Sequence, residues 1–244
     1  MLEKLPENYR AVVFGASGGI GAAMVAALSD DPRCAGVWAG ARIAPGDAGK
    51  VTGFAFNLTD ESSIAGAAEA IGEGGPVHLV LVTTGILHTE TFGPERSWRE
   101  LDAATMAQVF AINTIGPALI AKHMLDLMPR EDAAIFAALS ARVGSIGDNR
   151  LGGWHSYRAS KAALNMLIRN FAIELGRKRK KAICVGLHPG TVDTGLSEPF
   201  QRGVPDGKLF TPAYSAENLL KVLTGLTPLE SGHAFAWDGK RIDA

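Results

Sequence analysis

The chain has 244 residues, of which 47% are hydrophobic and 20% are charged. These fractions are close to those of soluble globular domains, so they exclude wholesale disorder and allow a sizeable buried core. The 24 Lys and Arg residues are balanced by 25 Asp and Glu residues, which excludes a protein drawn as a whole to nucleic acid or to an anionic membrane. We therefore expect a single domain, residues 1–244, that recognises its partners locally.

The start of the chain lacks the layout of a secretory signal, and no later run approaches a membrane-spanning helix in length. We therefore expect a cytoplasmic protein without a membrane partner. Cys34 and Cys184 lie far apart in apolar segments, which indicates buried thiols rather than a disulfide or a metal site. The six histidines form no ligand-like cluster, so no metal is expected.

Short apolar runs alternate with longer helix-compatible stretches along the chain. The first run, residues 10–14, is followed by an alanine-rich stretch at 19–29 that predicts a helix. Further strands are expected at 37–40, 51–56, 77–82, 133–139 and 182–187. Repeated strand and helix units predict one doubly wound α/β domain, with a mainly parallel, seven-stranded sheet flanked by helices.

Two long helices and one long loop follow from the spacing of apolar and turn-forming residues. Apolar side chains recur every three or four residues over 101–127 and 154–175. Residues 197–211 are rich in Gly, Pro and charge, which predicts a loop of the kind that often covers a site, before a short helix at 215–223. The basic run Arg177–Lys181 contains no aromatic residues, and we interpret it as a solvated turn rather than a nucleic-acid patch.

The glycine-rich segment Gly15-Ala-Ser-Gly-Gly-Ile-Gly21 lies between the first strand and the first helix. Glycines there let the backbone approach a pyrophosphate, which the free N–H groups and the dipole of the helix attract. We therefore expect a Rossmann-type dinucleotide site that includes Gly15, Ser17, Gly19, Ile20 and Gly21. The same segment matches the nucleophile elbow G-x-S-x-G, with Asp193 and His233 downstream. A serine hydrolase that uses Ser17 is the remote alternative, since an elbow on the first strand leaves no upstream loop for oxyanion donors.

The end of the second strand indicates which dinucleotide binds. No acidic residue lies between Val37 and Arg42 to bind a ribose hydroxyl. Arg42 instead offers a planar, permanently charged fork for a phosphate dianion. The sequence therefore favours NADPH (NADP) over NADH (NAD), and the competing interpretation is that Arg42 is a solvated loop residue.

Tyr157 and Lys161 are four residues apart and are therefore neighbours on one face of the later long helix. A phenol is a poor proton donor or acceptor near neutral pH unless a nearby cation stabilises its anion. Lys161 can be that cation. Taken alone, the spacing is more typical of an exposed helix surface.

Together with the glycine turn, this pair resembles the short-chain dehydrogenase/reductase family, whose Tyr-x-x-x-Lys and Gly-x-x-x-Gly-x-Gly signatures stand here as Tyr157–Lys161 and Gly15–Gly21. Asn113, Ser140 and Pro189–Thr194 match further family positions in order, so the resemblance covers nearly the whole chain. The segments around Ser140 and Tyr157, and the ending Trp-Asp-Gly, look most like the C-factor and sniffer-type subgroup.

The resemblance implies that Tyr157 is the general acid or base, that Lys161 lowers its pKa and binds the nicotinamide ribose, and that Ser140 donates a hydrogen bond to the reacting oxygen. Asn113 would hold a water that leads to the lysine. Its carbonyl fits this role because Pro117, four residues later, has no N–H to occupy it. The family pattern also implies cofactor contacts from Asn57, Leu58, Thr84, Gly85, Tyr157, Lys161, Pro189, Gly190, Val192 and Thr194.

Several positions depart from the family pattern, among them Asn57, which stands where an acidic residue often contacts adenine. Phe14 stands where threonine is usual, and Val82-Thr-Thr-Gly85 replaces an asparagine-rich turn, which places the hydrogen bonds of that turn in doubt. Counted back from Gly144, the usual catalytic serine falls on Ala141, one residue after Ser140. We choose Ser140 because it ends a strand, whereas Ser145 lies beyond the turn.

The sequence thus predicts an NADPH-preferring oxidoreductase that interconverts a small-molecule carbonyl and a secondary alcohol. A homodimer or homotetramer is expected, formed through the two long helices. The alternative is a cofactor-bound signalling or scaffold protein of the same fold with little catalysis. The identity of the substrate depends on the 197–211 loop and on the side chains that follow Ser140.

Overall fold

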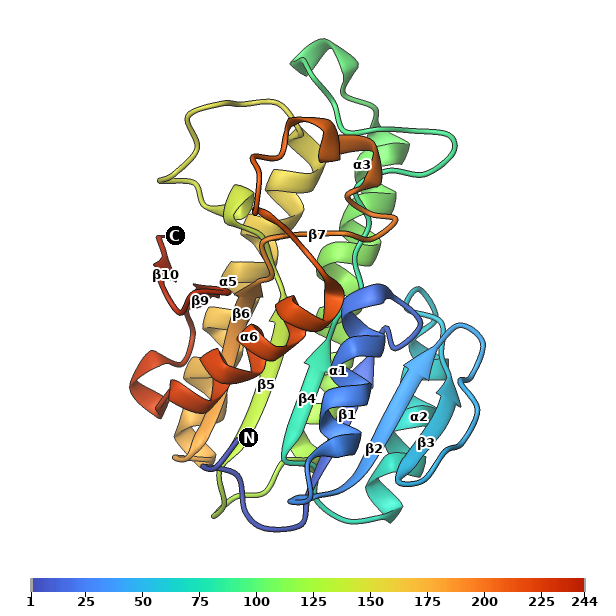
Figure 1. Ribbon diagram of the computed structural model, residues 1–244, viewed down its shortest axis with the longest axis vertical. Coiled ribbons are helices and arrows are strands. Elements are labelled where there is room, and N and C mark those ends of the chain that lie inside the picture. Colours follow the sequence, from blue (N-terminus) through green and yellow to red (C-terminus); the bar gives the residue numbers. More distant parts are fainter. Residues whose placement is uncertain (1, 244) are drawn as a thin grey trace.

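A central parallel sheet organises the chain, of which the computed structural model describes residues 2–243 (Figure 1). The strand order is β10-β9-β6-β5-β4-β1-β2-β3. The strands are β1 (Tyr9–Phe14), β2 (Cys34–Ala41), β3 (Val51–Ala55), β4 (Leu79–Val82), β5 (Ala134–Leu139), β6 (Ala182–His188), β9 (Ala234–Ala236) and β10 (Arg241–Ile242). Seven of them run parallel, which confirms the mainly parallel sheet, and β10 pairs antiparallel with β9 at the edge. The sheet therefore has eight strands rather than the seven that were predicted. A separate parallel pair joins β7 (Thr191–Val192) to β8 (Leu209–Phe210).

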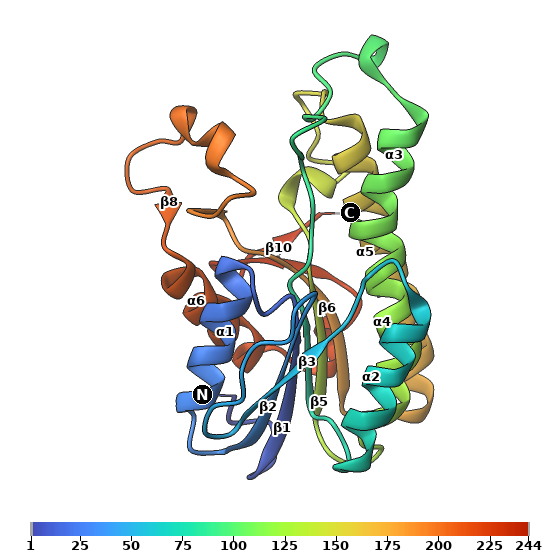
Figure 2. The same ribbon diagram turned by 90° about the vertical axis from the view of Figure 1, so that its right-hand side faces the viewer.

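Helices cover both faces of the sheet, as Figure 2 shows. One face carries α1 (Gly19–Asp30) and α6 (Pro212–Gly225), and the other carries α2 (Glu61–Glu73), α3 (Ala103–Phe110), α4 (Gly116–Met124) and α5 (His155–Lys178). Val13 packs in the core under α1 and α6, whereas Val12 and Phe14 pack in the core under α2, α4 and α5. Because both faces of β1 are buried, its sequence is a continuous apolar run rather than an alternating one. The doubly wound prediction is therefore confirmed.

The helical run predicted over 101–127 is interrupted. It consists of α3, a π-helical segment at Ala111–Ile115, α4 and a short 3₁₀ turn at Leu125–Leu127. The N–H of Gly116 bonds to the carbonyl of Ala111, five residues back. Such π segments are rare and often lie at functional sites, and this one contains Asn113.

The same run, Ala103–Leu127, has a mean hydropathy of 1.4 in its most apolar window, so by length and composition it is able to cross a membrane. The expectation that no run approaches this size was therefore wrong. A single helix of this kind is weak evidence for a membrane span, because core helices pass the same test. Ile120 and Met124 of this run are fully buried in the core beside α2 and α5.

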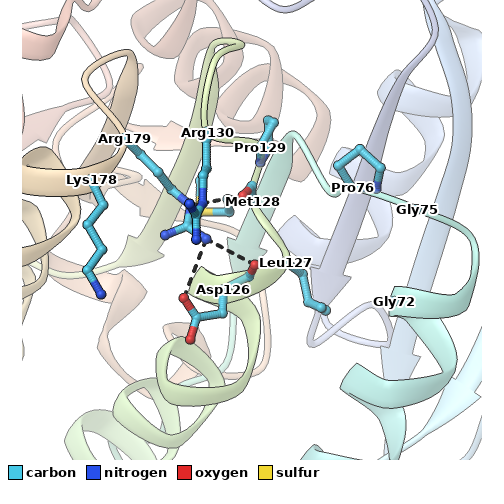
Figure 3. A pocket seen from close by; sticks show the side chains of 10 residues that line it. All are labelled: Gly72, Gly75, Pro76, Asp126, Leu127, Met128, Pro129, Arg130, Lys178 and Arg179. Atoms are coloured by element: carbon cyan, nitrogen blue, oxygen red, sulfur yellow. Dashed lines mark hydrogen bonds and ion pairs between the residues drawn. The ribbon is translucent and has the colours of Figure 1, made fainter.

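The basic run at the end of α5 is only partly a solvated turn. Arg179 is 5% exposed, and its guanidinium donates to the carbonyl oxygens of Met128 at 2.9 Å and Asp126 at 3.1 Å (Figure 3). These contacts line a hollow of about 700 Å³ at the amino ends of the strands. Arg179 therefore ties α5 to the segment before β5. Cys34 and Cys184 are buried free thiols, as predicted.

Candidate active site

The glycine turn leaves the amino end of α1 open to a ligand. Gly15 has a φ of +99°, which an L side chain rarely adopts. α1 begins at Gly19, with no side-chain cap from Gly18 and no acidic residue in its first turn. A Cβ at Gly21 would lie 2.1 Å from the carbonyl oxygen of Gly15, so only glycine lets α1 approach the turn this closely. The uncapped N–H groups and the helix dipole fit a phosphate anion.

Thr83 replaces the hydrogen bonds that the asparagine-rich turn would supply. Its Oγ1 donates to the carbonyl of Phe14 at 2.9 Å and lies 3.2 Å from the carbonyl of Gly15. These bonds join the end of β4 to the end of β1, which resolves the doubt raised by the sequence. The missing asparagine is thus compensated by a shorter hydroxyl side chain.

A cavity of about 470 Å³ opens at the carboxyl ends of β1, β4, β5 and β6, where ligands bind in doubly wound sheets. The predicted residues that line it are Gly19, Ile20, Gly21, Thr84, Gly85, Ser140, Tyr157, Lys161, Pro189, Gly190, Val192 and Thr194. Thr84 Oγ1 and His188 Nδ1 are buried without a hydrogen-bond partner among residues 2–243, and both residues line the cavity. Orphaned polar atoms beside an uncapped helix fit a polar ligand such as a dinucleotide.

Tyr157 and Lys161 lie side by side on α5, and both side chains are buried. Lys161 Nζ lies 5.8 Å from the centre of the Tyr157 ring and donates to the carbonyl of Leu139 at 2.8 Å. Burial raises the pKa of Tyr157 to about 12 and lowers the pKa of Lys161 to about 8. The expected lowering of the Tyr157 pKa is therefore not seen in the chain by itself, because burial desolvates the phenol and disfavours its anion. The phenol is protonated at neutral pH.

Asn113 joins the π-helical segment to the loop that follows β4 and to α5. Its Oδ1 accepts from the N–H of Ile86 at 2.8 Å, and its Nδ2 donates to the carbonyl of Ile86 at 2.9 Å and to Ser160 Oγ at 3.1 Å. A Cβ at Gly85 would lie 3.6 Å from both Asn113 Oδ1 and Lys161 Nζ. Asn113 thus lies next to the Tyr157–Lys161 pair, behind the cavity wall.

Ser140 reaches the cavity, but its hydroxyl points elsewhere. Its Oγ donates to Asn165 Oδ1 at 2.7 Å, one helical turn beyond Lys161 on α5. Ala141 instead packs in one apolar cluster with Tyr157 and Leu87. Ser145 Oγ accepts from the N–H of Asp148 at 3.0 Å. The spacing of the sequence does not show the bond to Asn165, and the role of Ser140 as donor to the reacting oxygen stays a prediction.

Several predicted cofactor residues lie outside the cavity wall. Ser17 and Arg42 are exposed, and Arg42 follows β2 directly beside the glycine turn, where Gly15 and Ala16 donate to Gly40. Asn57 is exposed, and its Oδ1 accepts from the N–H and the hydroxyl of Thr59. The side chain of Leu58 is buried against Gly116, so only its backbone is free to face a cofactor.

The structure does not support the serine hydrolase arrangement. Ser17 and His233 do not line the same cavity: His233 lines a hollow between α5 and β10. Asp193 accepts from Gln201 Nε2 at 3.0 Å. The three residues of the supposed triad therefore have separate surroundings.

An apolar wall completes the cavity, and most of it could not be predicted from the sequence. Leu87, Val143, Trp154, Leu196, Phe200 and Val204 line this side. Trp154 immediately precedes α5, and Phe200 belongs to a 3₁₀ segment, Glu198–Gly203, inside the predicted loop 197–211. The loop and the side chains that follow Ser140, which include Val143, were expected at the site. Leu87 and Trp154 were not, because four separate segments meet here only through the fold.

The fold and this site define a dinucleotide-binding oxidoreductase. A family model described as short chain dehydrogenase matches residues 9–204. The chain belongs to the short-chain dehydrogenase/reductase family and is an oxidoreductase that binds a nicotinamide cofactor.

Individual relatives agree with this assignment. The chain is 33% identical to the C-signal protein of Myxococcus xanthus over 168 residues, which cover 69% of this chain and 93% of that protein. It is 31% identical to 1-hydroxy-2-glutathionyl-2-methyl-3-butene dehydrogenase of Rhodococcus sp. over 232 residues, 93% of this chain and 96% of the other.

Solved structures show the same fold. The NADPH-bound carbonyl reductase from chicken fatty liver superposes with a TM-score of 0.80 at 27% identity and covers 98% of this chain and 100% of its own. The carbonyl reductase Sniffer of D. melanogaster gives a TM-score of 0.81 at 19% identity, with coverage of 97% and 99%, and supports the fold alone.

Proposed function

We propose that this protein is an NADPH-preferring reductase that converts a carbonyl compound to an alcohol, with Tyr157 as the proton donor. The observation that carries the proposal is the buried Tyr157–Lys161 pair in the wall of a cavity that also contains the uncapped end of α1. The NADPH-bound carbonyl reductase with the same fold supports the cofactor and the direction of reaction.

Tyr157, Lys161 and Asn113 have different roles in the proposed reaction. When bound, the reduced nicotinamide supplies the hydride to the carbonyl carbon and is oxidised. Tyr157 Oη, whose pKa of about 12 keeps it protonated, gives its proton to the carbonyl oxygen. Lys161 stays charged below its pKa of about 8 and stabilises the phenolate that remains. Asn113 holds the backbone of Ile86 and also bonds to Ser160 on α5. It thereby fixes the distance between the loop after β4 and the helix that carries Tyr157.

The preference for NADPH rests on Arg42. It lies exposed beside the glycine turn and has no ion-pair partner within residues 2–243, so its guanidinium is free to bind a phosphate. Parallel titrations with NADPH and NADH, followed by nicotinamide fluorescence, test this assignment. Arg42→Ala should weaken NADPH binding by roughly 10-fold or more and leave NADH binding unchanged, since a charge-assisted bond is lost. Equal weakening of both cofactors would contradict the role of Arg42.

The rival proposal of a signalling or scaffold protein makes a different prediction for Tyr157. Tyr157→Phe keeps the ring and removes the acid, so we expect carbonyl reduction to fall by about 10²–10⁴-fold while NADPH binding persists. A biological effect retained in this variant would favour the scaffold. Loss of cofactor binding in the wild-type chain would remove both proposals.

We also infer self-association through the helices that carry the site. Ile115 in the π-helical segment and Met166 and Ile173 on α5 are 52%, 62% and 46% exposed. Apolar side chains at this density on adjacent helices favour a homodimer or homotetramer interface. Light scattering of the wild type and of Met166→Glu tests it, and an unchanged mass would contradict it.

A further inference from the structure

The entry to α5 has an unusual backbone. Gly152, Gly153 and Trp154 have φ values of +65°, +63° and +50°, three left-handed residues in succession. Two of them are glycines, for which this conformation is ordinary. Trp154 is a bulky residue in the same region, where non-glycine residues are rare and often belong to functional sites. Something must hold Trp154 in this conformation.

Glu95, from the loop after β4, holds it. The carbonyl of Glu95 accepts from the N–H of Trp154 at 2.5 Å. Its carboxylate accepts from the N–H of Ser156 at 3.2 Å and from the Ser156 hydroxyl. Glu95 is 5% exposed and has no ion-pair partner among the described residues.

The carboxylate is stabilised by the helix it touches. α5 spans 24 residues and has neither a side-chain cap nor an acidic residue of its own in its first turn. An anion at the amino end of such a helix interacts favourably with the dipole and with the free N–H groups. Glu95 supplies that anion, although it lies 61 residues before Ser156 in the chain. Ser156, which it contacts, directly precedes Tyr157.

This clamp directs the ring of Trp154 into the cavity wall. Its centroid lies 6.2 Å from the ring of Tyr157, edge to face, and 5.2 Å from the ring of Phe200. Phe200 in turn lies 5.8 Å from His88, whose Nε2 bonds to the carbonyl of Gly195 at 3.0 Å. Trp154 thus joins the proton donor to the segment that covers the site.

The wall around Trp154 suits a flat apolar ligand. Leu87, Val143, Leu196 and Val204 complete it, and none of the residues that line the cavity is Asp or Glu. Aromatic rings arranged in this way prefer a third ring, edge to face or offset, over a saturated group of equal size.

We propose that Trp154 is a specificity-determining residue that selects an aromatic carbonyl substrate, and that Glu95 is the positioning residue that holds it beside Tyr157. The proposal rests on the proposed carbonyl reductase function. In the reaction the carbonyl carbon gains a hydride from the bound cofactor, and the oxygen gains the proton of Tyr157.

Two aldehydes of nearly equal size test the proposal: benzaldehyde and cyclohexanecarbaldehyde. The ratio of the two kcat/KM values is divided by the ratio of the rates at which borohydride reduces the two aldehydes, which corrects for intrinsic reactivity. We expect this corrected ratio to favour benzaldehyde by roughly three- to tenfold in the wild type, which is the contribution of one aromatic contact. Trp154→Leu keeps an apolar side chain and should bring the corrected ratio close to one. Trp98→Leu, at a tryptophan that is 65% exposed and outside the cavity, is the matched control and should leave the ratio unchanged.

Glu95→Gln separates positioning from general stability. The amide keeps the size of the side chain but loses the charge at α5, so the benzaldehyde preference should fall by roughly half or more, mainly through KM. Arg179→Met, which removes a buried charge at the other end of the sheet, should lower the melting temperature and leave the preference unchanged.

Failure of the proposed reductase function and failure of the roles of Trp154 and Glu95 give different results. Absence of NADPH binding, or reduction of neither aldehyde, would refute the reductase. Reduction of both aldehydes with no corrected preference in the wild type, or with a preference that survives Trp154→Leu, would overturn the role of Trp154 alone. A preference unchanged in Glu95→Gln would overturn the role of Glu95.

Discussion

The cavity has a cofactor half, around the glycine turn and Thr83, and a substrate half, around Ser140, Trp154 and Phe200. Departures from the family pattern have different consequences in the two halves. In the cofactor half, threonine replaces asparagine at position 83, and its hydroxyl still bonds to the carbonyl of Phe14. In the substrate half, Ser140 bonds to Asn165 and Ala141 packs beside Tyr157. The glycine turn and the end of α1 have to approach the pyrophosphate of any dinucleotide, so the cofactor half must keep its geometry by compensation. The substrate half has no such constraint, and its side chains differ freely.

The largest effect should come from the cofactor half. Gly21→Ala places a Cβ 2.1 Å from the carbonyl oxygen of Gly15, which forces α1 away from the turn. We expect NADPH affinity to fall by about 100-fold or more, because the helix end and the turn no longer converge on the phosphates. Gly66→Ala on α2, where a Cβ meets nothing within 4 Å, is the control and should bind normally. Equal affinities would show that α1 tolerates the shift.

The pH dependence of the reaction tests the proton-transfer pair that lies between the halves. Below pH 8 Lys161 is charged, and Tyr157, with a pKa of about 12, is protonated. We expect kcat/KM for carbonyl reduction to be level near neutral pH and to fall by up to about tenfold per unit above the pKa of Lys161. Alcohol oxidation should rise over the same range, since it needs the phenolate. A reduction rate that is flat to pH 10 would contradict the requirement for a charged Lys161.

Thr83 provides a measurement of compensation in the cofactor half. Thr83→Val keeps the shape of the side chain and removes the hydroxyl bond to the carbonyl oxygen of Phe14, while the backbone N–H of residue 83 still donates to that oxygen at 2.8 Å. We therefore expect the free energy of unfolding to fall by about 0.5–1.5 kcal/mol, the net contribution of one hydrogen bond. Thr84→Val is the matched control, because Thr84 Oγ1 has no partner within the described chain. That variant should be as stable as the wild type or more so. Urea unfolding of both variants measures whether the hydroxyl of Thr83 stabilises the contact between the ends of β4 and β1.

The smallest effect is expected in the substrate half. Ser140→Ala distinguishes the role that the family resemblance implies from the contact that the structure shows. If the hydroxyl keeps its bond to Asn165, we expect kcat to change by at most about threefold. Ala141→Ser adds a hydroxyl in the cluster with Tyr157 and should raise kcat by supplying a second donor to the reacting oxygen. A loss of 100-fold or more in Ser140→Ala would instead establish Ser140 as that donor.

The sequence by itself determined the fold class and the core of the site. Apolar runs separated by helix-compatible stretches specify parallel strands that are buried on both faces, and β1 to β6 lie within a few residues of the predicted runs. The glycine turn and the Tyr157–Lys161 pair are local, because their function depends on spacing within one turn or one helix. Pro117 likewise marks the irregular segment at Asn113, since a missing N–H is a covalent property of the chain.

Tertiary structure decided what depends on contacts between distant segments. The bond from Ser140 to Asn165 joins β5 to α5, and the clamp of Glu95 on Ser156 spans 61 residues. No local pattern encodes these pairs, because each requires the sheet to bring two chain segments together. Burial acts in the same way on Tyr157, whose pKa rises to about 12 because the folded chain removes water from it. Residue spacing specifies which groups are neighbours, and only packing sets their solvation and their remaining partners.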